Sequence, residues 1–554
     1  MSGLSAPPGD TSGSSAQEKV FRSAGVASFA VLVSRISGLV RESLMGALFG
    51  AGSAMDAFVV GFRIPNLTRD LFAEGALSSA FIPTFVDYLQ KRGKEEAAHL
   101  ANLVATSIVL IVGALCVAGV CASPWLVGAL TQGWVENAPE KYNLAVLLTQ
   151  IMFPFLLLVS LAAQAMGVLN ACNQFAVPAF SSTWFNVGSV VFGVSLGFLA
   201  GPRLGFQPIV GMAFGVLVGG ALQLGWQVPS LLRHGFRFRP AFDFGHPGLR
   251  HILKLMGPAI IGSASVQVNV LVNTMFATGI SDSVRGYDGP VGWLNYAFRF
   301  MQLPLGLFGV AIATATLPAI GRSASSGDID EFRETLARSL GLVFLLTVPS
   351  SMGLILMGPS IVGAIYEHRK FEAYDTQQTA LALSCYALGL AGYSAIKVLT
   401  PAFYALQDAR TPMAVSLASI VINAGMAFVL VRVANLGHAG LALATSAVAL
   451  FSFLALFWIM KRRLGGIHGR RLRSVIVKVA GGSFLMALVV LAAHRALELA
   501  IQQRFWLHLA DVAVTIPLGA ATVWYCCRWM KVEELEMASR ALAGPVFRRF
   551  GRKP

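Results

Sequence analysis

Long apolar stretches, separated by short polar segments, occupy the chain from about residue 22 to residue 527. A helix that crosses a bilayer needs about 20 mostly apolar residues. Fourteen stretches satisfy this requirement, so the pattern predicts an all-α polytopic membrane protein with fourteen transmembrane helices. The predicted spans are residues 22–48, 54–86, 99–126, 143–169, 175–199, 207–232, 250–278, 290–319, 339–358, 378–404, 411–432, 438–460, 475–494 and 505–527.

The composition agrees with this pattern. Of the 554 residues, 55% are hydrophobic and only 12% are charged, whereas soluble domains average about 25% charged residues. This deficit excludes a soluble cytosolic enzyme. The sequence contains no P-loop, HExxH or CxxC motif, which argues against direct ATP drive and against catalysis. We therefore expect a transporter that is not an enzyme and that uses no cofactor and no metal.

Basic residues are distributed unevenly over the predicted loops. An even number of spans places both termini on one side of the membrane, where 27 Lys and Arg residues fall, against 8 in the opposite loops. By the positive-inside rule, both termini are cytoplasmic. The net charge of +15 thus follows from topology, and we expect no nucleic-acid binding. Residues 1–21 are predicted to be a disordered cytoplasmic tail, and residues 528–554 a basic cytoplasmic tail.

Two pairs of similar segments indicate an internal repeat. GALSSAFIP ends at Pro83 and GVAIATATLP ends at Pro318, 235 positions later. LNACNQFAVP ends at Pro178 and FYALQDARTP ends at Pro412, 234 positions later. Six spans separate the partners, so the repeats share one orientation and are related by a pseudo-twofold axis along the membrane normal. We predict two six-helix lobes and two appended helices, over residues 22–232, 250–460 and 475–527 respectively.

Charged residues inside the predicted spans are the main candidates for a functional site. A basic side chain at the bilayer centre costs about 2.5–3.5 kcal/mol, so each needs water, a counter-charge or an anionic ligand. The basic residues are Arg35, Arg41, Arg63, Arg69, Arg299 and Lys397, and the acids set against them are Asp56, Asp70 and Glu74. This tally leaves a surplus of three positive charges. A polyanion-binding cavity explains the surplus, because the guanidinium fork matches phosphate oxygens.

The spacing of the arginines limits how they meet. Arg35 and Arg41 are six residues apart, and so are Arg63 and Arg69. Six steps leave two side chains about 120° apart on a straight helix. Each pair brackets a residue that loosens a helix, a glycine in the first pair and a proline in the second, so a bend could aim both arginines into one cavity.

A purely structural interpretation of these charges stays open. Arg69 could form a latch between the lobes with Asp70 and with Glu74, which lies one turn further along. Arg35 and Arg63 could reach water near helix ends, and Lys397 could neutralise a helix end. A scaffolding protein of this kind would tolerate the loss of these charges, whereas a transporter would not.

The stretch from residue 34 to residue 85, SRISGLVRESLMGALFGAGSAMDAFVVGFRIPNLTRDLFAEGALSSAFIPTF, closely resembles the opening of the MurJ/MviN family. Members are lipid II flippases of the multidrug/oligosaccharidyl-lipid/polysaccharide exporter superfamily. The motifs SRxxGxxR, GAGxxxDAF, PNLxR and FAEGAxSxAFIP occur in the family's order. KVLTPAFYALQDARTP, at 397–412, resembles the family's signature in its tenth helix.

This resemblance implies a function and a set of residues. The expected substrate is lipid II, undecaprenyl-pyrophosphoryl-MurNAc-pentapeptide-GlcNAc, moved from the inner to the outer leaflet of the bacterial cytoplasmic membrane. The expected partners are lipid II and membrane lipids, with the cell-wall synthesis machinery as a further candidate. The pyrophosphate-binding arginines of the family fall on Arg41, Arg69 and Arg299, with Arg35 nearby, and its important acids match Asp56 and Glu74. With Asp70, Arg63 and Lys397, these acids form the predicted gating and ion-pair set. Residues 475–527 would form a groove for the polyprenyl tail.

One departure from the family concerns sodium. Some members bind sodium through carboxylates in the second lobe, but the spans predicted at 250–278, 411–432 and 438–460 contain no Asp or Glu. Hard cations prefer oxygen ligands that are often anionic. We therefore expect no sodium coupling at that place and consider the membrane potential the more plausible driver.

Two related functions remain as alternatives. A multidrug exporter of the same superfamily would bind cations and should have an acidic cavity, which the tally of charges disfavours. A flippase for another polyprenyl-linked oligosaccharide would share the basic cavity, and only the PNLxR and FAEGA motifs favour lipid II over it.

Overall fold

The computed structural model describes residues 11–69 and 77–536. Throughout these two ranges the regular structure is helical, with one isolated bridge between Asp282 and Gly286, which confirms the all-α fold. Asp70 and Glu74 of the predicted site, and part of each predicted tail, lie outside the described residues. The first helix begins at Thr11, before the predicted span.

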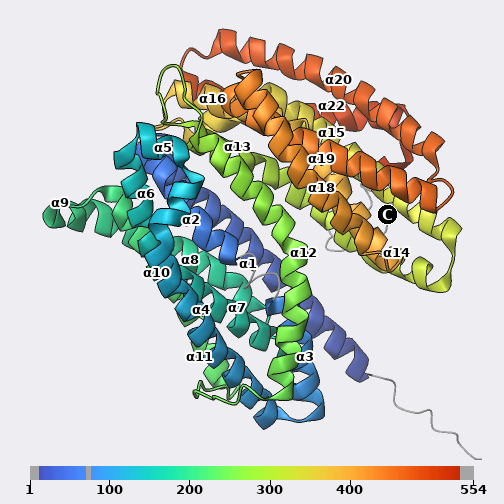
Figure 1. The fold of residues 1–554 in the computed structure, drawn as a ribbon. Coiled ribbons are helices and arrows are strands. Elements are labelled where there is room, and N and C mark those ends of the chain that lie inside the picture. Colours follow the sequence, from blue (N-terminus) through green and yellow to red (C-terminus); the bar gives the residue numbers. More distant parts are fainter. Residues whose placement is uncertain (1–10, 70–76, 537–554) are drawn as a thin grey trace, which may run out of the picture. The chain divides into compact units, whose positions relative to one another are not determined.

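The chain divides into two compact units, and several helices contribute to both (Figure 1). Unit 1 comprises the described parts of Met1–Met45, Val60–Gly128 and Glu140–Ala264. The helices that lie wholly or partly in it are α1 (Thr11–Phe49), α2 (Ser53–Arg69), α3 (Ser78–Lys91), α4 (Lys94–Leu130), α6 (Pro139–Met152), α7 (Phe155–Ala171), α8 (Ala176–Val194), the π-helix η2 (Ser195–Ala200), α9 (Gly201–Leu204), α10 (Pro208–Gly225), α11 (Val228–Arg233) and α12 (Pro247–Thr278).

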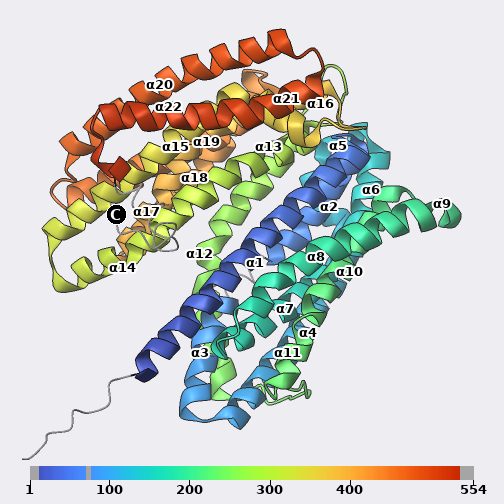
Figure 2. The same cartoon turned by 180° about the vertical axis from the view of Figure 1, so that it is seen from behind.

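Unit 2 comprises Gly46–Val59, Ala129–Pro139 and the described part of Ser265–Pro554. It receives the end of α1, the start of α2 and the second half of α12. Its further helices are α5 (Gln132–Asn137), α13 (Pro290–Pro304), η3 (Leu305–Val310), α14 (Ala311–Ser326), α15 (Ile329–Tyr366), α16 (Ala373–Ala387), α17 (Leu390–Ala405), α18 (Arg410–Ala427), η4 (Phe428–Val433), α19 (Gly437–Arg463), α20 (Gly469–Ala500), α21 (Arg504–Ala510), η5 (Asp511–Thr515) and α22 (Ile516–Trp529). The last pair, α20 and α22, lies side by side against α15 (Figure 2).

Most predicted spans appear as long apolar helices. In the described part of the chain, ten helices are long and apolar enough to cross a membrane, and α16 with α17 forms an eleventh if this pair, bent by 43°, is one span. The stretches predicted at 22–48, 54–86 and 250–278 are occupied by α1, by α2 with α3, and by α12, which do not meet this criterion. The number fourteen therefore stays a prediction.

The backbone repeats the spacing found in the sequence. Asn173 and Gln407, 234 positions apart, both adopt positive φ angles, of 59° and 57°, and each is the second residue after a helix, α7 and α17 respectively. Gly93 and Gly327, again 234 positions apart, have φ angles of 89° and 73° after α3 and α14. The π-helical turns η2 and η4 follow α8 and α18. Helix ends, and not only proline residues, are thus shared by the two halves.

Glycines allow close helix packing in unit 1. A Cβ atom on Gly211 of α10 would lie 2.2 Å from the backbone nitrogen of Gly197 in η2, and one on Gly193 would lie 2.8 Å from the sulfur of Met212. Gly193 and Gly197 belong to the string GVSLG, which matches the GxSxG pattern of hydrolases. That pattern needs a strand-to-helix turn, whereas here it lies across α8 and η2. The match is therefore a packing motif.

Candidate functional site

The SRxxGxxR motif docks α1 onto α8 within unit 1. The side-chain amide of Asn186 donates to the carbonyl oxygen of Ser34 at 3.2 Å and to the hydroxyl of Ser37 at 3.0 Å. A Cβ atom on Gly38 would lie 3.5 Å from the same amide nitrogen. The small residues of the motif therefore hold the helix in place. Arg35 projects from α1 as an exposed side chain.

Arg41 is held by two groups of unit 1. Its Nη2 donates to Oε1 of Glu42 at 2.8 Å, and 19% of the arginine side chain and 12% of the glutamate side chain are exposed. The guanidinium also lies over the ring of Phe185 on α8, 5.3 Å from the ring centroid. This contact favours a cation in that place. An anionic ligand of Arg41 would have to compete with Glu42.

Glu42 corrects the tally of charges made from the sequence. It lies inside the span predicted at 22–48, and Asp511 lies inside the span predicted at 505–527, but neither was counted. With both acids included, the surplus of basic side chains falls from three to one. A glutamate that follows an arginine directly in an apolar stretch was the signal available in the sequence.

The second pair of arginines lies on α2. Arg63 and Arg69 are both half-buried, and Arg69 is in the last turn of the helix. The helix continues through Pro65, and the hydroxyl of Thr68 donates to the carbonyl oxygen of Ile64 at 2.6 Å. Because Asp70 and Glu74 follow directly in residues that the structure does not describe, the predicted latch around Arg69 stays a prediction.

Arg299 and Lys397 both face away from the interior of unit 2. Arg299 on α13 is exposed, whereas Ala297 and Met301 are fully buried. Two helical steps turn a side chain by about 200°, so a residue flanked in this way points away from the packed face. Lys397 on α17 is exposed in the same manner between Ala395 and Leu399, which are fully buried.

Asp56 caps the first turn of α13 within unit 2. Its buried carboxylate accepts the backbone N–H of Gly289 at 2.8 Å and that of Gly292 at 2.7 Å. Pro290 occupies the first helical turn and has no N–H to satisfy. A carboxylate at this place satisfies free donors and complements the helix dipole. The GAGxxxDAF motif thus has a structural task at the end of α13, while the predicted gating role of Asp56 stays a prediction.

The structure divides the predicted residues between the two units. Four of the predicted site arginines lie in unit 1, and the remaining described site residues lie in unit 2. The first set is Arg35, Arg41, Arg63 and Arg69, and the second is Asp56, Arg299 and Lys397. Their convergence on one cavity therefore remains a prediction from the sequence.

Neutral amide side chains lie in two of the three second-lobe helices for which the sequence predicts no sodium binding. On α12 and α18 of unit 2, Asn423 donates to Asn273 at 2.8 Å, and Asn269 donates to Ser419 at 3.2 Å. Asn273 in turn donates to Thr445 of α19 at 3.2 Å. Among the described residues, no cluster of three or more His, Cys, Asp and Glu side chains is arranged to hold a metal ion.

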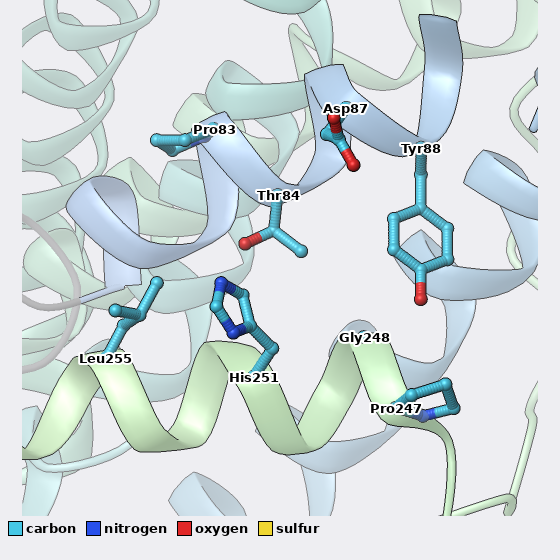
Figure 3. Close-up of a pocket in the computed structure, with 8 residues that line it drawn as sticks. All are labelled: Pro83, Thr84, Asp87, Tyr88, Pro247, Gly248, His251 and Leu255. Atoms are coloured by element: carbon cyan, nitrogen blue, oxygen red, sulfur yellow. The ribbon is translucent and has the colours of Figure 1, made fainter. Parts of the chain in front are cut away.

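Unit 1 also contains a cavity of about 330 Å³ between α3 and α12 (Figure 3). His251 of α12 points towards Thr84 of α3, and Tyr88 lies across from Gly248. The lining residues are Pro83, Thr84, Asp87, Tyr88, Pro247, Gly248, His251 and Leu255. Because none of these eight is Lys or Arg, this cavity is distinct from the predicted anion-binding site.

Comparisons with known proteins relate most of the chain to one family of membrane proteins. The family model described as lipid II flippase MurJ matches residues 45–509. The lipid II flippase MurJ of Burkholderia cenocepacia is 34% identical over 448 residues, which are 80% of this chain and 84% of that protein. A relative in Vibrio cholerae is 32% identical over 450 residues, which are 79% of this chain and 82% of the relative.

Solved structures show the same relationship. A lipid II flippase MurJ in an inward closed conformation matches with a TM-score of 0.72 and 26% identity, over 91% of this chain and 98% of that one. An inward-facing multidrug-resistance transporter of the MATE family matches with a TM-score of 0.64, over 78% of this chain and 94% of that one. At 15% identity, this second match shows the shared fold alone.

Proposed function

We propose that this chain, which belongs to the lipid II flippase MurJ family, moves lipid II from the inner to the outer leaflet of the bacterial cytoplasmic membrane. The observation that carries this proposal is the match of the family model over residues 45–509. The chain is then a multi-pass transporter of the inner membrane with both termini in the cytoplasm. Membrane lipids surround it, and the cell-wall synthesis machinery consumes its product.

The proposed mechanism is alternating access. The pyrophosphate of lipid II docks on Arg41, Arg69 and Arg299, assisted by Arg35, while the polyprenyl tail stays in the bilayer along α20 and α22. Arginine suits this task because its planar fork donates two parallel hydrogen bonds to phosphate oxygens. Bound pyrophosphate offsets the repulsion among the arginines, so that the binding site closes around it and reopens on the other side.

Acidic residues pair with the basic residues while the empty carrier returns to the inner side of the membrane. Glu42 lies 2.8 Å from the guanidinium of Arg41, and in the proposed cycle the pyrophosphate takes the place of this carboxylate. Asp56 and Glu74, with Asp70, Arg63 and Lys397, form ion pairs in one state only and bias the empty carrier towards the inner side. The membrane potential acts on the mobile positive charges with about 2.3 kcal/mol per charge per 100 mV.

Complementation tests this function. A bacterium depleted of its own lipid II flippase should regain growth and outer-leaflet lipid II when it expresses this chain. Arg41→Ala, Arg69→Ala and Arg299→Ala should each lose this rescue at normal expression. Arg495→Ala is the matched control, because Arg495 is 78% exposed and pairs with Glu498. Rescue by all three arginine variants would refute the binding site, and failure of the wild-type chain to restore lipid II in the outer leaflet would refute the function.

A further inference from the structure

A buried carboxylate connects the two C-terminal helices to α15. Asp511, the first residue of η5, has a side chain with no exposed surface. Its Oδ2 accepts the hydroxyl of Ser360 on α15 at 2.7 Å and lies 2.8 Å from Nδ1 of His494 on α20. Its Oδ1 is buried and has no hydrogen-bond partner among the described residues. Three helical segments thus meet at one carboxylate inside unit 2.

The proton count of this cluster follows from its surroundings. An ionised carboxylate with only neutral partners is costly to bury in a membrane protein. Ser360 is neutral, so the groups of this cluster that can neutralise the carboxylate with a proton are Asp511 itself and His494. In either case the Asp511–His494 pair binds one proton more than an ionised carboxylate beside a neutral imidazole does.

A second set of titratable groups extends from this pair towards exposed residues. On α21, His508 is 7% exposed, and its Nε2 lies 3.6 Å from Oε2 of Glu367, which directly follows α15. Arg504 is 56% exposed, and its Nε lies 3.6 Å from the other oxygen of Glu367. The other charged pair on this part of α20, Arg495 with Glu498, is exposed. The titratable and charged groups around the buried pair therefore come from α15, α20 and α21, and of these Arg504, Arg495 and Glu498 are exposed.

The rest of the contact between α15 and the C-terminal pair is largely apolar. Met357 of α15 packs in one cluster with Val479 and Met486 of α20 and Val523 of α22. The hydroxyl of Thr515 donates to the sulfur of Met357 at 3.7 Å. An apolar contact has no preferred register, so the hydrogen bonds of Asp511 are a directional link between these helices, as is the ion pair of Arg471 on α20 with Glu334 on α15 at 3.8 Å.

We propose that Asp511 and His494 form a proton-binding site that couples the packing of α20 and α22 on α15 to transport. One proton is taken up as the pair closes and is given back to water as it opens, and only an O–H or N–H bond changes. The site thereby adds proton coupling to the carrier, an inference that rests on the proposed function because the same helices flank the lipid tail of the substrate.

The experiment uses the full chain in proteoliposomes and has two independent readouts. The first is the infrared difference spectrum between acidic and neutral pH, in which both carboxylic-acid and imidazolium bands are visible, recorded without lipid II for the wild type, Asp511→Asn and His494→Gln. The second is the rate of lipid II flipping between about pH 5 and pH 8, where imidazole titrates. Glu498→Gln is the matched control, since it removes an exposed acid from the same helix.

The proposal predicts that replacement of Asp511 removes the pH dependence of flipping, whereas replacement of Glu498 leaves it unchanged. The wild type and Glu498→Gln should show a flipping rate that changes by up to about tenfold per pH unit on one side of the midpoint, since a one-proton step follows proton activity there. The flipping rate of Asp511→Asn and of His494→Gln should change by less than about twofold over the same range. The infrared difference bands of the wild type that are missing in Asp511→Asn should also be missing in His494→Gln. Equal pH profiles for the wild type and both variants would overturn the proton site.

The two readouts also separate the two proposals. A protein that shows the Asp511-dependent infrared change but moves no lipid II retains the proton site and refutes the proposed function. A protein that moves lipid II but shows neither the infrared change nor a pH dependence specific to Asp511 retains the function and refutes the proton site. Because Asn and Gln are close in shape to the residues they replace, one of the two variants suffices if the other is not recovered folded.

Discussion

The carboxylate of Asp56 accepts the backbone N–H of Gly292 at 2.7 Å, although the two residues are 236 positions apart in the chain. The contact joins the first turn of α2 to the first turn of α13 within unit 2. Gly289 donates to the other oxygen of the same carboxylate at 2.8 Å. One side chain therefore satisfies two donors at a helix start that has no cap of its own.

Removal of this cap should destabilise the protein. We expect Asp56→Ala to lower the stability by about 1–3 kcal/mol, because two buried N–H groups lose their acceptor. The thermal unfolding midpoint of the purified protein in detergent measures the effect. Glu136→Gln, an exposed acid on α5, is the control and should leave the midpoint unchanged. A midpoint of Asp56→Ala equal to that of the wild type would contradict the capping role.

Glu42 should compete with the substrate for Arg41. We expect Glu42→Gln to raise the affinity for lipid II by about three- to tenfold, since a neutral amide holds the guanidinium less strongly than a carboxylate does. Arg41→Ala should lower the affinity, and the two changes should not be additive. Binding of lipid II to the single and double variants gives the full cycle. If Glu42→Gln strengthens binding equally in the absence of Arg41, the two residues do not act through each other.

Gly211 should not tolerate a side chain. Its added Cβ would lie 2.2 Å from the nitrogen of Gly197, so α10 and η2 would have to separate. We expect Gly211→Ala to cost at least about 1–3 kcal/mol of stability. Gly113→Ala is the control, because a Cβ atom there meets nothing within 4 Å. Thermal midpoints of the two variants should differ, with only the first lowered; equal midpoints would show that the helices can move apart freely.

Asp408 should make stability depend on pH in the acid range. The backbone N–H and the hydroxyl of Thr411 accompany an ion pair with Arg463, and together they lower the pKa of Asp408 below its ordinary value of 3.8. A lowered pKa in the folded state stabilises the protein above the unfolded pKa, and this contribution is lost as the pH falls through the folded pKa.

The variant Asp408→Asn should lack this pH dependence of stability. Asp408→Asn should already be less stable than the wild type at neutral pH, and the difference between the two should shrink as the solution is acidified below the ordinary pKa. Thermal midpoints of both proteins along a pH series measure this difference, and all other acids cancel in the comparison. A difference that stays constant down to the lowest pH would show that the carboxylate of Asp408 contributes no linkage.

Much of the architecture could be predicted from local patterns. Apolar length alone located the helices that are long enough to cross a membrane, because each must satisfy its backbone internally. The spacing of proline residues predicted the repeat, and the positive φ angles of Asn173 and Gln407 follow the same interval. Asn186 had no such signal, since its contact with Ser34 and Ser37 crosses from α8 to α1.

The sequence by itself determined the class of protein, the helical fold, the family and the candidate arginines, because apolar length and motif order are properties of the chain read in one direction. The tertiary structure alone decided which groups neutralise which charges. Asp56 accepts two N–H groups of α13, and Asp511 contacts His494 and Ser360 from two other helices. A buried charge is stabilised by whatever the fold brings within hydrogen-bond distance, and that distance is set by packing between segments far apart in the sequence.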